Sequence, residues 1–145
     1  MSFMLHPRLA TDTTVLGDLP LCRVLLSKEA LGPWLILVPR KEALREIHHL
    51  PMEEQYQLMR ESSAVAALLE TDYQADKINV GALGNLVPQL HVHHIARFEN
   101  DVAWPGPIWG NTDGTQRSDE LQRALAEELV AELANIEGFQ AADEF

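Results

Sequence analysis

The chain is short of cysteine and of long hydrophobic runs, and each shortage excludes a class of protein. Cys22 is the only cysteine among 145 residues, so no disulfide can form within the chain, which suits a reducing compartment. No apolar stretch approaches the roughly 20 residues of a membrane-spanning helix, and the first residues lack the pattern of a secretory signal. We therefore expect a cytoplasmic protein that has no membrane partner.

Basic residues are also scarce. The chain has 11 Lys and Arg against 22 Asp and Glu, which gives a formal net charge of −11. This charge repels a nucleic-acid backbone, and no cluster of basic residues interleaved with aromatics offsets it. A nucleotide is still acceptable, because backbone N–H groups and imidazoles can hold a small anion within an acidic protein. We expect no nucleic-acid polymer as a partner.

The length and the order of the expected elements predict the fold class. One domain over residues 1–145 is long enough to bury a core without disulfides. Three apolar runs, separated by Gly-Asp and Gly-Pro turn signals, predict consecutive antiparallel strands at 14–16, 21–26 and 34–38. Two further strands are expected at 78–80 and 90–98.

Helices are expected between the third strand and the last two strands, and again at the C-terminus. Residues 43–49 have helical composition, and residues 52–74 predict one long helix whose buried face carries Tyr56, Met59, Ala66 and Leu69. Strands, a helix and then strands, with no repeated strand-helix-strand unit, are typical of an α+β protein. We therefore predict an α+β fold with an antiparallel sheet of about five strands, one long helix and a C-terminal helix.

The domain is expected to consist of four segments. Residues 1–13 form an N-terminal segment with a short helix, residues 14–98 form the core, and residues 99–117 form an irregular connection rich in Pro and Gly. Trp104 and Trp109 of this connection either fill a core or lie near the site of a neighbouring subunit. Residues 118–138 predict an amphipathic helix, which packs on the domain or on a second subunit; its apolar stripe is Leu121, Leu125, Leu129, Leu133 and Ile136.

The strand at 90–98 carries an unusual row of polar side chains. Because successive side chains of a strand point to opposite faces, Gln89, His91 and His93 are expected on one face, about 7 Å apart pairwise. His94 is expected on the other face as a packing residue. Imidazoles side by side need hydrogen-bond partners when they are buried, so this row predicts an anion or metal site.

These residues carry a family resemblance. Residues 89–95, QLHVHHI, resemble the His-φ-His-φ-His-φ-φ motif (φ apolar) of the histidine triad family of nucleotide hydrolases and transferases. The upstream residues 79–85, NVGALGN, are similar to the glycine loop of the family, and residues 34–40, WLILVPR, to its strand that ends in Pro-Lys/Arg. The resemblance covers residues 22–98 in the family's order.

The resemblance implies a mechanism. A neutral His91, oriented by a backbone carbonyl, attacks an α-phosphorus and forms a covalent nucleotidyl-histidine that water cleaves. His93 donates to a phosphate oxygen or helps to protonate the leaving group. Gly84 and Asn85 cradle the anion, and Asn79 shapes or contacts the nucleotide site. The implied substrate is a nucleoside phosphoanhydride or phosphoramidate, the implied assembly is a homodimer, and no metal or cofactor is implied.

The chain departs from the family pattern at several positions. Gln89 replaces the first histidine, and its amide can orient the row but cannot relay a proton. Leu86 stands where the family has Ser or Thr, and Glu42 stands where several members have a further His. No acid stands near Leu26 and Ser27, where the family has an Asp that grips the ribose.

Two other functions fit parts of the sequence. A degenerate triad protein would bind nucleotide without turnover, which the changes at Gln89 and Leu86 suit. A cupin-like protein would bind a metal through His91, His93 and Glu99, although the spacing to Glu99 is long and a second cupin motif is missing.

Overall fold

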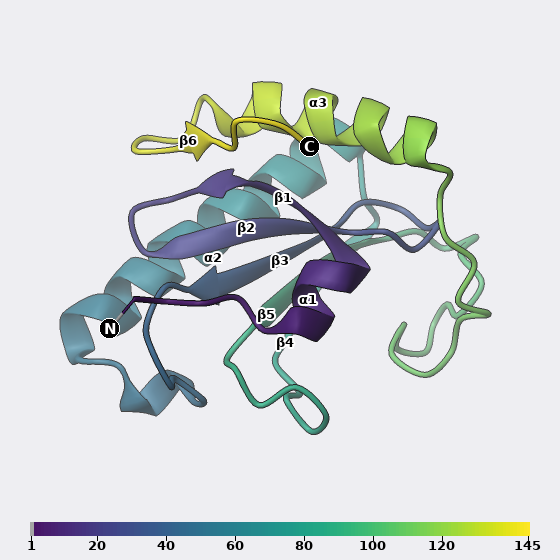
Figure 1. The fold of residues 1–145 in the computed structure, drawn as a ribbon. Coiled ribbons are helices and arrows are strands. Elements are labelled where there is room, and N and C mark those ends of the chain that lie inside the picture. The colour runs from purple at the N-terminus through teal and green to yellow at the C-terminus, as the bar shows by residue number, and fades with distance from the viewer. Residues whose placement is uncertain (1) are drawn as a thin grey trace.

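An antiparallel sheet is the centre of the fold. The computed structural model describes residues 2–145 and has six strands in the order β4-β5-β3-β2-β1-β6 (Figure 1). The strands are β1 (Thr13–Asp18), β2 (Cys22–Ser27), β3 (Trp34–Pro39), β4 (Lys77–Gly81), β5 (Val92–Arg97) and β6 (Gln140–Ala141). The α+β prediction is confirmed, and the extra strand is β6, a two-residue segment that pairs with β1.

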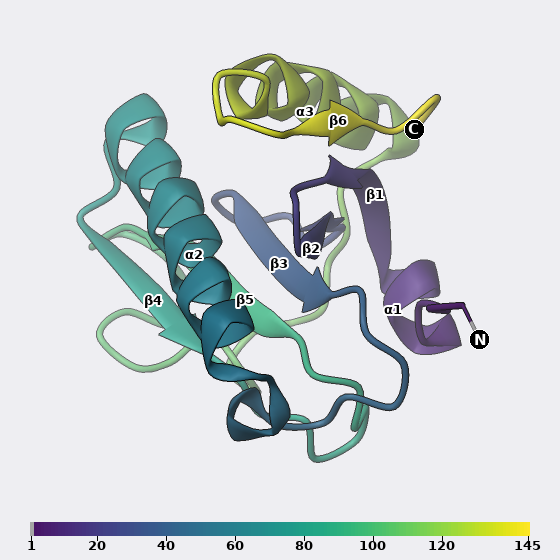
Figure 2. The ribbon, with the colours of Figure 1, turned by 90° about the vertical axis from the view of Figure 1, so that its left-hand side faces the viewer.

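Two long helices cover one face of the sheet. Helix α2 (Met52–Tyr73) crosses β5 and β4, and α3 (Asp119–Leu133) lies along β1 on the same side (Figure 2). The short helix α1 (Pro7–Asp12) packs beside β1 towards the opposite face, where Leu9 joins the core. The C-terminal helix therefore packs on its own domain.

The predicted helix at 43–49 is mostly wrong. Only Ile47–His49 form a helix, a single 3-10 turn. Ala43 has φ of 57°, a left-handed conformation that a regular α-helix does not contain. This segment therefore runs irregularly from β3 to α2.

The sheet separates two hydrophobic clusters because side chains alternate along each strand. On β3, Leu35 and Leu37 point towards α2 and α3, whereas Trp34, Ile36 and Val38 point to the opposite face. The cluster on the opposite face is smaller, and it is covered by α1 and by irregular segments in place of long helices. This is the face that carries the polar pocket described below.

The predicted buried face of α2 is wrong in part. Leu58, Val65 and Leu69 are buried together with Glu61, whereas Tyr56 is 51% exposed and Met59 is 64% exposed. The true stripe has the helical spacings 3, 4 and 4. A pattern of apolar residues misses it, because one of its four positions is a carboxylate.

The C-terminal helix departs from the prediction at its C-terminal end and in its buried face. Ser118 caps it as expected, since its Oγ accepts from the N–H of Leu121, but the helix ends at Leu133, five residues early. Leu129 and Leu133 are buried as predicted, whereas Leu121 is 62% exposed because it lies outside the buried stripe of the helix. The other two buried positions are Gln122 and Ala126.

Glu61 ties α2 to the sheet. Its two carboxylate oxygens accept the backbone N–H groups of Leu21 and Cys22, each at 2.8 Å, and Oε2 also accepts from Nε2 of Gln57 at 2.7 Å. Burial, and then the neighbouring carboxylate of Glu61, raise the pKa of the Cys22 thiol. The thiol therefore stays protonated, and the carboxylate fixes the start of β2.

We expect Glu61→Gln to lower the free energy of unfolding by about 1–3 kcal/mol, because one of the two buried N–H groups then faces an amide N–H and loses its acceptor. Urea denaturation followed by circular dichroism measures this change. Glu70→Gln, an exposed position on the same helix, is the matched control and should change the stability by less than about 0.5 kcal/mol. Equal stability of the two variants would contradict the role of Glu61.

Candidate functional site

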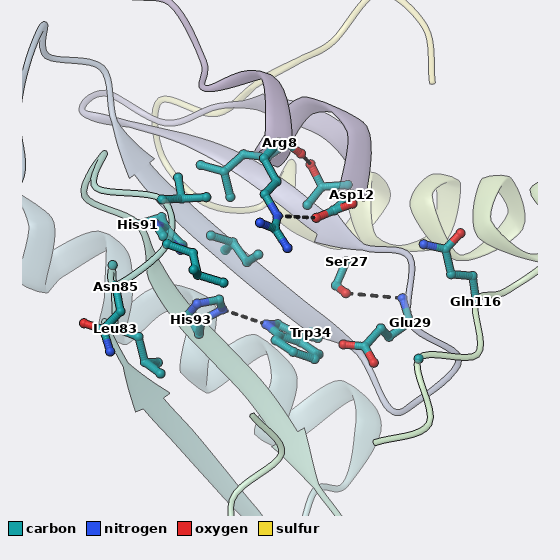
Figure 3. Close-up of a pocket in the computed structure, with 17 residues that line it drawn as sticks. Arg8, Asp12, Ser27, Glu29, Trp34, Leu83, Asn85, His91, His93 and Gln116 are labelled. Carbon is teal, nitrogen blue, oxygen red and sulfur yellow. Dashed lines mark hydrogen bonds and ion pairs between the residues drawn. The ribbon is translucent and has the colours of Figure 1, made fainter. Parts of the chain in front are cut away.

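A pocket of about 630 Å³ lies on the face of the sheet opposite α2 and α3 (Figure 3). Its walls come from α1, the end of β2, the start of β3, the loop at 83–87, the start of β5 and residues 114–116. Two imidazoles, His91 and His93, lie at one side of it next to the loop that carries Asn85. The pocket therefore gathers segments that are far apart in the sequence.

The expected alignment of Gln89 with the two imidazoles is wrong. Strand β5 begins at Val92, because its pairing with β3 ends there, so Gln89 precedes the strand. The Gln89 side chain is bound by the N-terminal segment: Nε2 donates to the carbonyl of Met4, and Oε1 accepts from the N–H of His6, both at 2.9 Å. Gln89 does not line the pocket with the imidazoles.

The backbone of Gln89, however, orients His91. Nδ1 of His91 lies 2.7 Å from the Gln89 carbonyl oxygen. Since a carbonyl only accepts, Nδ1 carries a proton, and in the neutral ring Nε2 is the nitrogen with the lone pair. This is the carbonyl contact that the family resemblance implies. The carbonyl thus selects one tautomer of the neutral imidazole, with Nε2 as its free nitrogen, at the wall of the pocket.

His93 is held by an indole. Nδ1 of His93 accepts from Nε1 of Trp34 at 3.0 Å. The sheet register explains this contact: Ile36 is paired with His93 and Trp34 with Ile95, so Trp34 is the diagonal neighbour of His93. Burial, and after it the imidazoles of His91 and His94, lower the pKa of His93 to about 3. His93 is therefore neutral at pH 7, with its proton on Nε2.

Two more rings surround His93. The His91 ring centroid is 5.0 Å away, and the Trp109 centroid is 5.4 Å away, both in edge-on geometry. Gly81 is paired with His93, and a Cβ at Gly81 would lie 3.0 Å from the Trp109 ring. The glycine thus leaves the space in which Trp109 reaches His93. Trp104 does not belong to this group of rings. The guanidinium of Arg97 lies over its ring, with the guanidinium carbon 5.7 Å from the ring centroid.

His94 lies on the other face, as predicted. Its Nδ1 is 3.1 Å from the Val92 carbonyl, and its Nε2 is 2.7 Å from Oγ of Ser62 on α2. Burial lowers the pKa of His94 to about 4. It is a fully buried packing residue with both nitrogens bonded.

The loop before β5 supplies backbone and amide groups. Gly84 has φ of 73°, a left-handed conformation that favours glycine, and both Gly84 and Asn85 line the pocket. Leu86 lines the pocket rim and is 78% exposed. Asn79 does not line the pocket, because its Oδ1 accepts from Nη1 of Arg97 at 2.7 Å. Of the six candidate residues, four come together: His91, His93, Gly84 and Asn85.

The far side of the pocket holds groups that the sequence reasoning missed. Glu29 lines it, with Oε1 accepting from Oγ1 of Thr112 at 2.6 Å and its N–H donating to Oγ of Ser27. Arg8 and Asp12 of α1 also line it and form an ion pair at 4.0 Å. Glu29 is two residues after Ser27, near which the family has its Asp. Its position in the sequence could therefore have indicated an acid in the pocket. Nothing in the sequence indicated that α1 lines the same pocket as the two histidines.

The cupin-like alternative is wrong. The sheet is open and antiparallel with long helices on one face, whereas a cupin is a double-sheet barrel. Within residues 2–145, His91 and His93 are not joined by a third His, Cys, Asp or Glu in a group that could hold a metal ion.

Membrane spans are expected to be absent from the sequence. Among the helices of residues 2–145, none combines the length and the apolar character that a membrane span requires.

Comparison with known proteins agrees with the fold and the motif. A family model, HIT domain, matches residues 8–100. A histidine triad protein from Marinobacter aquaeolei VT8 is 47% identical with a TM-score of 0.88, over 92% of this chain and 98% of that one. One from Bradyrhizobium japonicum is 44% identical with a TM-score of 0.85, over 92% and 97%.

A third solved structure, a histidine triad protein from Sinorhizobium meliloti 1021, is 43% identical with a TM-score of 0.86, over 90% of this chain and 97% of that one. No curated protein matches the chain. The family model covers more than half of the chain, and these relatives match it over nearly their whole length. The chain therefore belongs to the histidine triad (HIT) family, and this membership supports a nucleotide-binding, hydrolase-type function.

Proposed function

We propose that the protein is a nucleotide phosphohydrolase or nucleotidyl transferase that acts through a covalent nucleotidyl-histidine at His91. The substrate is a nucleoside phosphoanhydride or phosphoramidate. The observation that carries this proposal is the 2.7 Å contact between Nδ1 of His91 and the Gln89 carbonyl, at the wall of a pocket. That contact leaves Nε2 as a nucleophile, which is the first requirement of covalent catalysis.

The first step forms a bond between Nε2 of His91 and the α-phosphorus, and the bond from phosphorus to the leaving group breaks. The imidazole becomes positively charged, and the Gln89 carbonyl at Nδ1 stabilises that charge. Water, or another acceptor in a transferase, then attacks the phosphorus and His91 leaves as a neutral imidazole. Gln89 thus acts through its carbonyl, while Met4 and His6 hold its side chain.

The phosphate is held by the groups around His91. Nε2–H of His93 donates to a phosphate oxygen, and the backbone and amide of Gly84 and Asn85 surround the anion from the loop. Asn79 acts indirectly, since its bond to Arg97 joins β4 to β5 beside the loop. A site assembled from neutral donors suits an acidic protein, because it needs no cluster of basic residues.

A second candidate function is nucleotide binding without turnover. The exposed Leu86 favours it, since this position offers no hydroxyl to the phosphate or leaving group. A rapid-quench experiment with dinucleoside polyphosphates, nucleoside phosphoramidates and acyl-adenylates separates the two. We expect an acid-labile nucleotidyl group on His91 during turnover. Saturable nucleotide binding with neither a trapped adduct nor product would support the binding module and contradict the enzyme.

We expect His93→Ala to lower kcat/KM by about 10²–10³-fold, the loss that follows removal of one donor from a developing oxyanion. Steady-state kinetics measure this loss, with whichever of the three substrate classes named above gives the highest kcat/KM. His49→Ala, which removes an exposed imidazole far from the pocket, is the control and should leave the rate unchanged. A loss of less than threefold in His93→Ala would contradict a donor role for His93.

We also propose a cytoplasmic homodimer. Strand β4 is a sheet edge on which Val80 is exposed, and Met52, Tyr56 and Met59 form an exposed apolar stripe on the neighbouring α2. An apolar edge of this kind is usually covered by another chain. Sedimentation equilibrium should give twice the chain mass, and Met59→Glu should lower the mass to that of one chain. A monomeric wild type would contradict the dimer.

A further inference from the structure

The indole of Trp34 donates a hydrogen bond to His93 inside the pocket wall, and this bond has a consequence for the reaction. We propose that Trp34 is a positioning residue that keeps His93 as a neutral Nε2–H donor, and that the enzyme is therefore selective for phosphoanhydrides over phosphoramidates. This inference rests on the proposed function, because it concerns the leaving group of the same reaction.

The geometry at Nδ1 of His93 allows a single tautomer. An indole N–H only donates, so the nitrogen 3.0 Å from Nε1 of Trp34 must be the acceptor, and the proton must sit on Nε2. Protonation of Nδ1 would place two N–H groups against each other in a buried position, where neither could turn to water. Trp34 thus opposes the imidazolium form and fixes the direction of the remaining donor.

The other groups near His93 do not favour the imidazolium form either. His91 is its neighbour on the same face, His94 lies behind it, and Trp109 is uncharged. The carboxylates of the pocket are engaged elsewhere, Asp12 with Arg8 and Glu29 with Thr112. In the described residues 2–145, His93 has no carboxylate among its hydrogen-bond partners.

The leaving groups of the two substrate classes differ in basicity. When Nε2 of His91 attacks a phosphoanhydride, the P–O bond breaks and its electron pair leaves on a phosphate oxygen with a pKa of about 6, so no proton is needed at pH 7. In an alkyl phosphoramidate, the P–N bond breaks towards an amine with a pKa of about 10, and this nitrogen must gain a proton as it leaves.

His93 cannot supply that proton. A neutral imidazole that gave up the proton on Nε2 would become an anion, so Nε2–H serves only as a hydrogen-bond donor. An enzyme with an imidazolium at this position would have a general acid for amines, worth about 10²–10⁴-fold. Without one, the phosphoanhydride reacts readily and the amine leaves slowly. In the second step, water bonds to phosphorus, the electron pair of the P–N bond returns to His91, and the proton of water passes to solvent.

The first test reads the tautomer directly by ¹⁵N NMR of the imidazole nitrogens in the full-length protein at pH 7. We expect a protonated Nε2 and an unprotonated Nδ1 at His93, and a mixture of tautomers in Trp34→Phe, which keeps the ring but lacks the donor. Trp109→Phe is the matched control: it also removes an indole beside His93, and it should leave the nitrogen shifts unchanged. A protonated Nδ1 in the wild type overturns the role of Trp34, whether or not the variant folds.

The second test compares a dinucleoside polyphosphate with nucleoside phosphoramidates of an alkylamine and of an arylamine. In the wild type we expect at least about 100-fold higher kcat/KM for the anhydride than for the alkyl compound, and a higher rate for the less basic arylamine. His93→Ala should lower the anhydride and alkylamine rates by the same factor. A loss ten times larger on the alkylamine would identify His93 as a proton donor and overturn the selectivity argument. If the wild type turns over neither class, the proposed function fails and the selectivity with it, whereas the nitrogen shifts still decide what Trp34 does.

Discussion

The variant His91→Ala is expected to lower kcat/KM by about 10⁴-fold or more, because it removes the atom that forms the covalent bond. The Gln89 carbonyl and the His93 donor remain in this variant, but they have no nucleophile to orient or assist. Substrate binding should survive, since the loop with Gly84 and Asn85 is unchanged. The loss should therefore appear in kcat much more than in the dissociation constant.

Steady-state rates with the best substrate of the panel, together with nucleotide titration, measure both quantities. The matched control is His48→Ala, an exposed imidazole on the 3-10 turn before α2, which should keep wild-type rates. Circular dichroism should give the same spectrum for all three proteins. Turnover of His91→Ala within tenfold of the wild type would show that His91 is not the nucleophile, even if the pocket binds nucleotide.

The sequence predicts those parts of the site that are close together in the chain. His91 and His93 are two residues apart and His94 alternates to the other face, so local backbone geometry is enough to assign their sides. The strands are predictable for the same reason, because apolar runs between turn signals are local features. The glycine loop lies directly before these histidines, which placed Gly84 and Asn85 in the same pocket.

The errors have tertiary causes. Gln89 does not lie in one row with His91 and His93, because the pairing of β5 with β3 ends at Val92. The partner of Val92 is Leu37, 55 residues earlier in the chain, so the start of β5 is not a local feature. Trp34 reaches His93 only through the register of β3 and β5, which an apolar pattern does not give. Trp109 arrives through an irregular connection, where no periodicity exists to be analysed.

Arg97 shows how the site depends on that irregular connection. Its side chain is 2% exposed at the end of β5, and it donates to both oxygens of Asp101, at 2.7 and 3.0 Å, and to the carbonyl of Gly106 at 2.8 Å. Asn79 on β4 accepts from the third nitrogen. One guanidinium thus joins two strands to the segment that carries Trp109 to the pocket.

We expect Arg97→Ala to lower the free energy of unfolding by about 3–5 kcal/mol, because it strands a carboxylate, an amide oxygen and a carbonyl that have lost their donor. For a chain of this size, the melting temperature should fall by roughly 10–20 °C. Arg23→Ala, which breaks a half-exposed ion pair with Asp18, is the matched control and should lose about 1 kcal/mol or less. Calorimetry of both variants at pH 7 measures the difference, and similar melting temperatures would contradict the role of Arg97.

The same network predicts a dependence on pH. Hydrogen bonds from Arg97, and then from backbone N–H groups, lower the pKa of Asp101 from 3.8 to about 2. A carboxyl group with a lowered pKa in the folded state stabilises the protein above its unfolded pKa, and this stabilisation is lost as the pH falls from about 4 to about 2. Arg97→Ala removes the cause of the shift, so the stability gap between wild type and variant should narrow across that interval. A gap that stays constant from pH 7 to pH 2 would mean that the guanidinium contributes by packing alone and that the ion pair with Asp101 adds nothing to the fold.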